Sequence, residues 1–472
     1  MATSTFPLIH GDATSSIPEL PTDRLLGWLR PFQEDSLRVM WQAFHAKGDL
    51  VRLRVGPLSV VVASHPDHLH HLLVRNQANW EKKTRGYQLL RKLLGDGLLT
   101  SDGELWKRQR RTANPAFRRK VIAGFADTMV DATADHLQGW DRHAAAGAPV
   151  DVADELGRLT LRIAGETLFS QDISTDGHAV GGALGVVMHA FGRLAMSVNP
   201  LAAWLPTPAN WRYHRALRTL DRVVRGIVDS RRSELSQGED GPTDLLGLFM
   251  AARDPETGEG MPDRLLRDEV LTMLLAGHET TAGALTWALY LLARHPEVAE
   301  RVFEEGQQVL GDRRPTAADS RALPLTRAVL LEGMRLFPPV WVTARVARED
   351  DELSGHPIKA GTFVFASNAI VHRHPRYWSE PDAFRPERFL EANPTCPDGS
   401  PRPRTAFQPF ASGSRKCIGE HFAMMEGILL LSLIVRRYRL ALPHDGYAPE
   451  PLASVTLRPK HGLPLRLVRR EG

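Results

Sequence analysis

Cys417 is the residue of this sequence whose position most clearly allows metal chemistry. It lies near the end of the glycine-bearing segment 410–419, directly before a long helical pattern. Backbone N–H groups and the helix dipole at a helix N-terminus stabilise a thiolate, the form of cysteine that ligates a metal ion. Gly413 and Gly419 would permit close backbone approach or a positive φ beside a flat cofactor, and Arg415 could pair with its carboxylate. A cysteine without such neighbours is most often a small buried apolar residue.

An acid next to an alcohol, Glu279 and Thr280, forms a second group with chemical potential. The pair lies in the middle of 264–294, a proline-free segment with apolar residues at helical spacing. Gly277 costs a helix about 1 kcal/mol relative to Ala, and threonine hydroxyls compete for backbone carbonyls, so we expect a local kink here. From the residues alone, a packing threonine and a solvated glutamate explain the pattern at least as well as a catalytic pair.

Both segments resemble signatures of the cytochrome P-450 family. Segment 410–419 matches the haem-binding signature F-x-x-G-x-R-x-C-x-G at all of its defined positions. Those positions are Phe410, Gly413, Arg415, Cys417 and Gly419. Segment 276–281 resembles the oxygen-binding motif A-G-x-E-T, with His278 at its variable position.

The resemblance implies a haem-thiolate monooxygenase with haem b as its cofactor. Cys417 would be the proximal thiolate ligand of the iron, whose electron donation favours O–O cleavage. Glu279 would relay protons from solvent, and Thr280 would hydrogen-bond the dioxygen species in the site. The cofactor-binding residues that the resemblance implies are Trp106, Arg110, Arg345, Phe410, Arg415, Cys417 and Gly419. We therefore expect one atom of O2 to be inserted into an apolar small molecule, by hydroxylation or epoxidation.

Two further motifs bear on how the haem loop is held. Glu332 and Arg335 are three residues apart on the predicted helix 325–336, and taken alone they would form a surface ion pair worth less than about 1 kcal/mol. They also resemble the family motif E-x-x-R, and 386–389 resembles its P-E-R-F segment. By that resemblance Glu332, Arg335 and Arg388 form a buried charge network, and the loss of one member would cost about 3 to 5 kcal/mol.

The remaining resemblances concern the haem propionates and the substrate. Trp106 and Arg110 match the family's W-x-x-x-R motif, and with Arg345 they would lie near a propionate. The substrate contacts implied by the resemblance come from 80–99, from 186–208, and from Ala276, Val340 and Trp341. Because these segments are rich in apolar residues, we expect a terpenoid, a fatty acid or a macrolide-like polyketide.

The elements that must position these residues are mostly helices. Helical periodicity dominates 105–309, and a further helix is predicted over 420–436. Runs of β-branched residues around Gly56-Pro57 predict a hairpin of 49–55 with 58–63. Short strands are also predicted at 341–347 and 362–366, before an irregular, proline-rich stretch over 372–405. We expect a mainly α fold with a minor β part.

Length and composition agree with one large domain. The chain has 472 residues, of which 43% are apolar and 24% charged, and no linker separates two cores. We therefore expect 1–472 to form a single domain without a fused reductase. The chain has only two cysteines, so the composition favours a reducing compartment. Of the two, Cys396 is expected to have no role. Without a signal peptide or a bilayer-spanning apolar run, we expect a cytoplasmic monomer with no membrane contact.

Electrons are expected to come from a separate ferredoxin or flavodoxin. A net charge of +4 is too small to indicate a polyanion partner, but basic residues gather near the predicted haem loop. These residues are Lys107, Arg108, Arg111, Arg118, Arg119, Lys120 and Lys416. They suit an acidic redox protein, and no recognition motif supports the alternative, nucleic acid.

Other functions stay open at this point. A haem-thiolate peroxygenase or isomerase would work without a reductase, although such enzymes typically lack the acid–alcohol pair. A haem sensor or carrier would need neither that pair nor an apolar pocket. A hydrolase using Cys417 with His421 lacks an oxyanion-hole signal. The histidines of 65–71 could suggest zinc, but a solvated turn explains them better.

Overall fold

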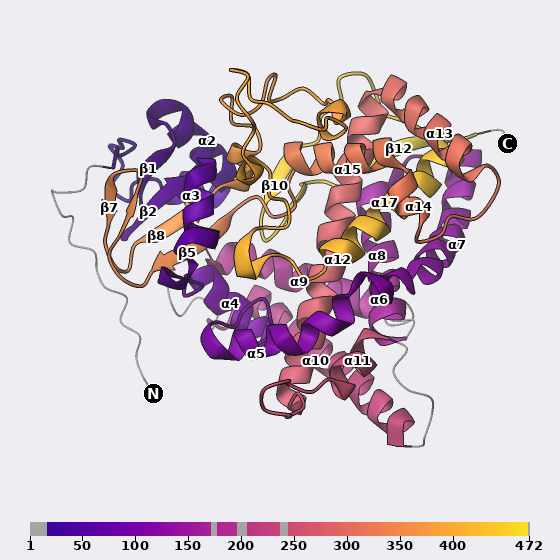
Figure 1. Ribbon diagram of the computed structural model, residues 1–472, viewed down its shortest axis with the longest axis horizontal. Helices are drawn as coiled ribbons and strands as arrows, with labels where there is room; N and C mark the ends of the chain where they lie inside the picture. Colours follow the sequence, from indigo (N-terminus) through magenta and orange to yellow (C-terminus); the bar gives the residue numbers. More distant parts are fainter. Residues whose placement is uncertain (1–16, 171–176, 196–204, 237–243, 471–472) are drawn as a thin grey trace.

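The computed structural model describes residues 17–170, 177–195, 205–236 and 244–470, and it places a β-containing part beside a larger helical body (Figure 1). Helix α12 (Asp263–Arg294) runs through the helical body and packs on α8 (Val152–Phe169), α15 (Pro324–Leu336) and α17 (Glu420–Arg437). The mainly α fold with a minor β part is confirmed. The other α-helices are α1 (Leu29–Glu34), α2 (Ser36–Lys47), α3 (Pro66–His70), α4 (Arg85–Leu94), α5 (Gly103–Ala113), α6 (Arg119–Ala123), α7 (Ala126–Ala145), α9 (Gly177–Ala195), α10 (Pro208–Ser236), α11 (Leu245–Ala251), α13 (Pro296–Leu310), α14 (Asp319–Ala322) and α16 (Asn368–Val371).

Helix α12 lies at the centre of the helical body, and most of its own residues are buried. Leu274, Leu285 and Trp287 have no exposed surface, and the Trp287 ring stacks on Phe337 with 4.0 Å between ring centroids. A helix that is apolar on all sides must be covered on all sides. The predicted helix 264–294 is confirmed to within one residue, and its α-helical assignment is continuous through the glycine and threonines.

A five-stranded sheet forms most of the β part, in the order β1-β2-β8-β5-β3. The predicted hairpin is confirmed, because β1 (Leu50–Val55) pairs antiparallel with β2 (Leu58–Ala63), and Gly56 between them has φ 61°. The strands predicted at 341–347 and 362–366 are confirmed as β5 (Thr343–Ala347) and β8 (Phe363–Ala366). Their pairing was not predicted: β8 is parallel to β2 and antiparallel to β5. The other strands that precede α17 in the sequence are β3 (Trp80–Glu81), β4 (Val150–Asp151), β6 (Asp351–Leu353) and β7 (His356–Ile358).

Four C-terminal strands were not predicted. Strand β9 (Tyr438–Ala441) pairs antiparallel with β12 (Pro464–Arg469), which also pairs with β4. Strands β10 (Pro451–Ala453) and β11 (Leu457–Pro459) form a small hairpin between them. Strands β10 and β11 have three residues each and contain proline, so they carry no readable alternation. Strands β9 and β12 do alternate between buried and exposed residues, and that pattern was missed in the sequence.

The histidines of 65–71 differ from the solvated turn that was expected. His68 is buried, with its Nε2 atom 2.8 Å from the Ser354 hydroxyl, and His71 lies 2.9 Å from the Asp351 carboxylate. Burial lowers the pKa of His68 to about 4, so the ring is neutral at pH 7. The expectation is therefore wrong for His68, whose partner comes from a distant strand turn.

Candidate functional site

The loop that carries Cys417 is closed by its own backbone. The Cys417 N–H donates to the Phe410 carbonyl at 2.8 Å, and α17 begins three residues after the cysteine. Gly413 has φ 70°, and a Cβ atom there would lie 2.0 Å from the Leu73 carbonyl oxygen. Glycine is thus required at position 413 by packing against the π-helical turn η1 (His71–Arg75). Gly419 has an ordinary φ of −85°, so of the two expected uses of glycine it does not show the positive φ; a Cβ atom there would lie 3.9 Å from the Cys417 sulfur.

Cys417 occupies an exposed position of its loop. The residue retains exposed surface, although burial raises the pKa of its thiol. The backbone N–H of Gly419 and the charge of Arg110 act in the opposite direction and favour the thiolate. The exposed surface of Cys417 requires open space beside the loop.

The middle turn of α12 is also accessible. Residues 270–275 and 281–292 of this helix are buried, whereas Ala276 is exposed and 277–280 are partly exposed. The Thr280 hydroxyl donates to the Ala276 carbonyl at 2.7 Å, which holds its side chain against the helix. Helix α12 packs on α17, the helix that begins three residues after Cys417, so this turn and the cysteine belong to neighbouring parts of the fold. An exposed turn within a central helix again indicates an internal space.

Glu279 is held at one oxygen. Its Oε1 atom accepts a hydrogen bond from the Thr456 hydroxyl at 3.1 Å, while its buried Oε2 atom has no partner among the described residues. Burial raises the pKa of this carboxyl, and the contacts with Thr456 and Arg458 partly offset that effect. The His278 ring, with its pKa lowered to about 4 by burial, is neutral at pH 7 and bonds to the Leu274 carbonyl.

Four cations gather around one carboxylate beside the thiol loop. Arg415 pairs with Asp102, donates to the Ser101 carbonyl at 3.1 Å, and lies 3.7 Å above the Trp106 ring centroid. Lys82 is buried, and its pKa is held well below the usual range by burial and by the neighbouring charges of Arg345, Arg415 and Arg110. Lys82 was not predicted from the sequence, because no motif marks it. The surplus of positive charge fits a ligand that brings two carboxylates.

The network expected below the haem loop is assembled and buried. Arg335 donates from Nε and Nη2 to the two carboxylate oxygens of Glu332, at 2.7 and 2.8 Å, and neither side chain is exposed. Arg388 Nε lies 3.4 Å from Glu332 Oε1, and Arg335 also donates to the carbonyls of His372, Pro381 and Ala383. The pair is thus not the surface ion pair that the residues alone suggested, but a bidentate contact that fixes the segment leading to the haem loop.

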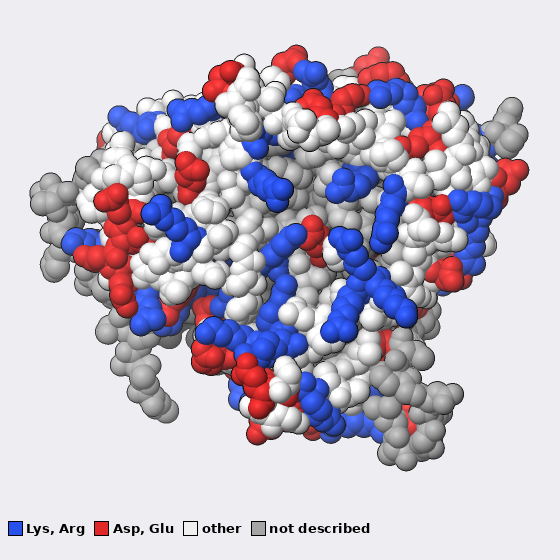
Figure 2. All heavy atoms as spheres, viewed as in Figure 1, with Lys and Arg blue, Asp and Glu red and all other residues white. Residues whose placement is uncertain are grey.

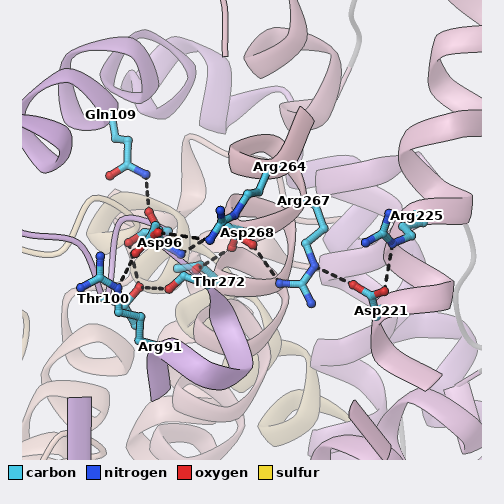
Figure 3. A network of polar contacts seen from close by, with 12 residues as sticks. Arg91, Asp96, Thr100, Gln109, Asp221, Arg225, Arg264, Arg267, Asp268 and Thr272 are labelled. Carbon is cyan, nitrogen blue, oxygen red and sulfur yellow. Dashed lines mark hydrogen bonds and ion pairs between the residues drawn. The ribbon is translucent and has the colours of Figure 1, made fainter. Parts of the chain in front are cut away.

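A second network ties the loop after α4 to α12 (Figure 3). The Asp96 N–H donates to Asp268 at 2.8 Å, and the Leu98 N–H donates to Glu269 Oε2 at 3.0 Å. Gly95 and Gly97 are required here, because a Cβ atom at either position would lie within 2.2 Å of a side chain of α12. This network was not predicted, since its partners are more than 170 residues apart. It fixes one of the segments from which substrate contacts were expected.

The expected substrate residues differ in their exposure. Val340 is exposed and Ala276 lies at the accessible turn, but Trp341 is buried and donates to the Ser454 carbonyl at 2.9 Å. Trp341 packs with Phe32 and Val39 in the core beside the sheet. Part of the expected segment 186–208 lies outside the described residues.

A helical body, an exposed cysteine directly before α17, and an acid–alcohol pair on α12, which packs on α17, define a haem-thiolate monooxygenase. The family model described as Cytochrome P-450 matches residues 18–465, and the chain therefore belongs to the cytochrome P-450 family. The cofactor of that family is a haem ligated by a cysteine thiolate. None of the described helices is long and apolar enough to cross a membrane.

Similar proteins support the same assignment. The chain is 37% identical to cyclooctatin synthase of Streptomyces melanosporofaciens over 89% of both chains. It is 34% identical to pentalenene oxygenase of Streptomyces avermitilis, over 90% of this chain and 91% of that protein. The crystal structure of the cytochrome P-450DA haem domain matches with a TM-score of 0.85 at 30% identity, covering 96% of this chain and 98% of that one.

Proposed function

We propose that this monooxygenase is a single haem domain that oxidises a terpenoid, with electrons from a separate protein. The observation that carries the oxygenase chemistry is the Glu279–Thr280 pair at the accessible turn of α12. A peroxygenase or isomerase has no use for such a pair, because it takes no protons from solvent to cleave O2.

Each group near the internal space has a role in this proposal. The residues present fit an iron porphyrin: Cys417 would hold the iron, and Arg110, Arg345 and Arg415, together with Lys82, would balance its propionates. The bound haem would supply the activation of O2. Glu279 would pass protons from its unpartnered oxygen, and Thr280 would hold a proton close to the reacting oxygen.

The ligand assignment is tested by a matched pair of cysteine variants. The reduced, carbon monoxide-bound protein should show the red-shifted Soret band of thiolate ligation. Cys417→Ala should abolish this band, whereas Cys396→Ala, which changes a buried cysteine outside the loop, should keep it. An unshifted band in the unmodified protein would refute the role of Cys417.

A terpenoid substrate is supported by the relatives and by the accessible surface. The similar proteins include a cyclooctatin synthase, a cyclooctat-9-en-7-ol 5-monooxygenase and a pentalenene oxygenase. Ala276 and Val340, both apolar, are exposed in the expected contact segments. Polycyclic terpene hydrocarbons should therefore induce the spectral shift of substrate binding at lower concentrations than fatty acids do. A stronger response to fatty acids would overturn this substrate class.

Docking of an electron donor is supported by charge on one face. Figure 2 shows Lys and Arg side chains gathered around a hollow on the face that carries α5, α6 and α17. Several members of the expected basic set are paired, since Lys107 lies 2.6 Å from Glu104 and Arg108 lies 3.0 Å from Glu259. Arg118 and Lys120 are exposed, and we assign most of the remaining attraction to them.

Charge reversal tests the docking face. Arg118→Glu with Lys120→Glu should slow electron transfer from an acidic ferredoxin at least several-fold at low salt, and high salt should remove the difference. Lys47→Glu, on an exposed position of α2, is the matched control and should have no effect. A rate that is indifferent to salt in all proteins would remove the steering argument.

A further inference from the structure

The hairpin of β10 and β11 reaches the acid of the α12 turn. Thr456, in the turn between the two strands, is buried, and its hydroxyl donates to Glu279 Oε1 at 3.1 Å. We propose that Thr456 is a positioning residue, which fixes the Glu279 carboxyl in one orientation and leaves Oε2 as the oxygen that exchanges protons. This inference rests on the proposed role of the acid–alcohol pair.

The hairpin is attached firmly enough to impose that orientation. The indole N–H of Trp287 donates to the Leu457 carbonyl at 3.0 Å, and the Leu457 N–H donates to the Pro339 carbonyl at 3.0 Å. The Trp341 indole donates to the Ser454 carbonyl at 2.9 Å, on the other side of Thr456. Thr456 is thus held through both of its sequence flanks, by α12 and by the segment before β5. A side chain whose backbone is held at both flanks can fix the orientation of the group to which it donates a hydrogen bond.

The contact is asymmetric, and this asymmetry suits proton transfer. Hydrogen bonds donated to both oxygens of a carboxyl favour its ionised form. A carboxyl that accepts no hydrogen bond could rotate freely. Glu279 is bonded at Oε1 and has no described partner at the buried Oε2 atom. The charge that acts on it comes from Arg458 of β11, and its neighbour His278 is neutral at pH 7. One oxygen is therefore fixed while the other remains available.

The same hairpin borders the expected substrate segments. A Cβ atom placed on Gly192 of α9 would lie 3.4 Å from the Ser454 hydroxyl, so the hairpin turn is in van der Waals reach of that helix. Trp341 contacts the turn from the segment that also contains the exposed Val340. The residue that orients the acid therefore belongs to a loop that contacts two of the expected substrate segments.

Three variants separate positioning from packing. Thr456→Val removes the hydroxyl at nearly constant volume, Thr456→Ser keeps the hydroxyl, and Thr286→Val is the matched control. Thr286 is a buried threonine of α12 whose hydroxyl donates to the Ala282 carbonyl at 2.7 Å, away from Glu279. All three proteins should bind haem and show the carbon monoxide spectrum of the unmodified protein.

Two measurements then test the proposal. With a surrogate ferredoxin system, Thr456→Val should divert electrons to peroxide and lower product per NADPH several-fold, and Thr456→Ser should restore it. In the resting holoenzyme, infrared titration of the carboxyl band that Glu279→Gln lacks should show a higher pKa in Thr456→Val than in the unmodified protein. Thr286→Val should change neither quantity. If Thr456→Val behaves like Thr286→Val in the titration, the positioning role is refuted.

Thr280→Ala distinguishes failure of this inference from failure of the proposed function. If Thr280→Ala uncouples the enzyme while Thr456→Val does not, Thr456 has no positioning role and the acid–alcohol pair stands. If Thr280→Ala leaves coupling unchanged, the pair itself is not used, and the role of Thr456 is refuted with it.

Discussion

Two glutamates, one fully buried and one partly exposed, show how differently the molecule treats the support of its site and the site itself. Glu332, below the thiol loop, receives two hydrogen bonds from Arg335, one from the Arg385 backbone N–H and a nearby charge from Arg388. Glu279, on the accessible turn of α12, receives one hydrogen bond from a hydroxyl. The supporting acid, Glu332, accepts hydrogen bonds at both carboxylate oxygens. The acid of the site, Glu279, accepts one hydrogen bond and has one oxygen without a partner among the described residues. Buried polar groups without full partners cost stability, and they concentrate where function requires them.

The largest effect should follow from breaking the supporting pair. Arg335→Ala would leave Glu332 as a buried charge without its main partner, so the free energy of unfolding should fall by about 3 to 5 kcal/mol. Chemical denaturation of the haem-loaded protein would measure this. Arg301→Ala removes an ion pair with Glu387 in which both side chains are about half exposed, and it should cost less than about 1 kcal/mol. Equal losses in the two variants would contradict the contrast between buried and exposed pairs.

A second buried acid of the contacting helices should give a pH-dependent effect. Glu426 of α17 is fully buried, and burial raises the pKa of its carboxyl to about 8, with a contact to Thr281 acting in the opposite direction. The folded protein therefore binds this proton more tightly than the unfolded chain, and its contribution to stability is lost as pH rises from about 4.5 to 8.

Glu426→Gln keeps the shape of the neutral acid and removes the titration. Relative to the unmodified protein, the variant should gain free energy of unfolding as pH rises through this window, by at most about 1.4 kcal/mol per pH unit. Unfolding of both proteins at several pH values between 5 and 8 would measure the difference. A difference that does not change with pH would show that Glu426 is ionised in the folded protein.

The smallest effect concerns strain in the supporting loop. Ala411 has φ 58°, a left-handed conformation that costs a residue with a Cβ atom about 1 to 2 kcal/mol. Ala411→Gly should relieve part of this strain, offset by the greater freedom of glycine in the unfolded chain. We expect a gain of less than about 1 kcal/mol, visible as a small rise in the thermal midpoint without change in the carbon monoxide spectrum. A clear loss of stability would show that the methyl group contributes more by packing than it costs by strain.

The sequence predicted the parts of both regions that lie close together along the chain. The helix over 264–294, the hairpin of 49–55 with 58–63, and the loop ending in Cys417 each have a local pattern of periodicity, turn residues or motif spacing. No such local pattern marks the contacts of Lys82, Thr456 and Asp268, because their partners are distant in sequence and meet only when the chain folds. Thr456 and Glu279, for example, are 177 residues apart. His68 was misread for the same reason, since its burial depends on a strand turn 286 residues away.

The surplus of cations around Asp102 also has a consequence for how the protein is made. Lys82, Arg110, Arg345 and Arg415 come from four separate parts of the chain, and bringing them together with one carboxylate, Asp102, is unfavourable. A dianionic ligand that binds the folded state alone would remove this penalty and favour the folded state by mass action. By this linkage, the stability of the newly synthesised chain depends on haem supply, and the chain without haem is the less stable form.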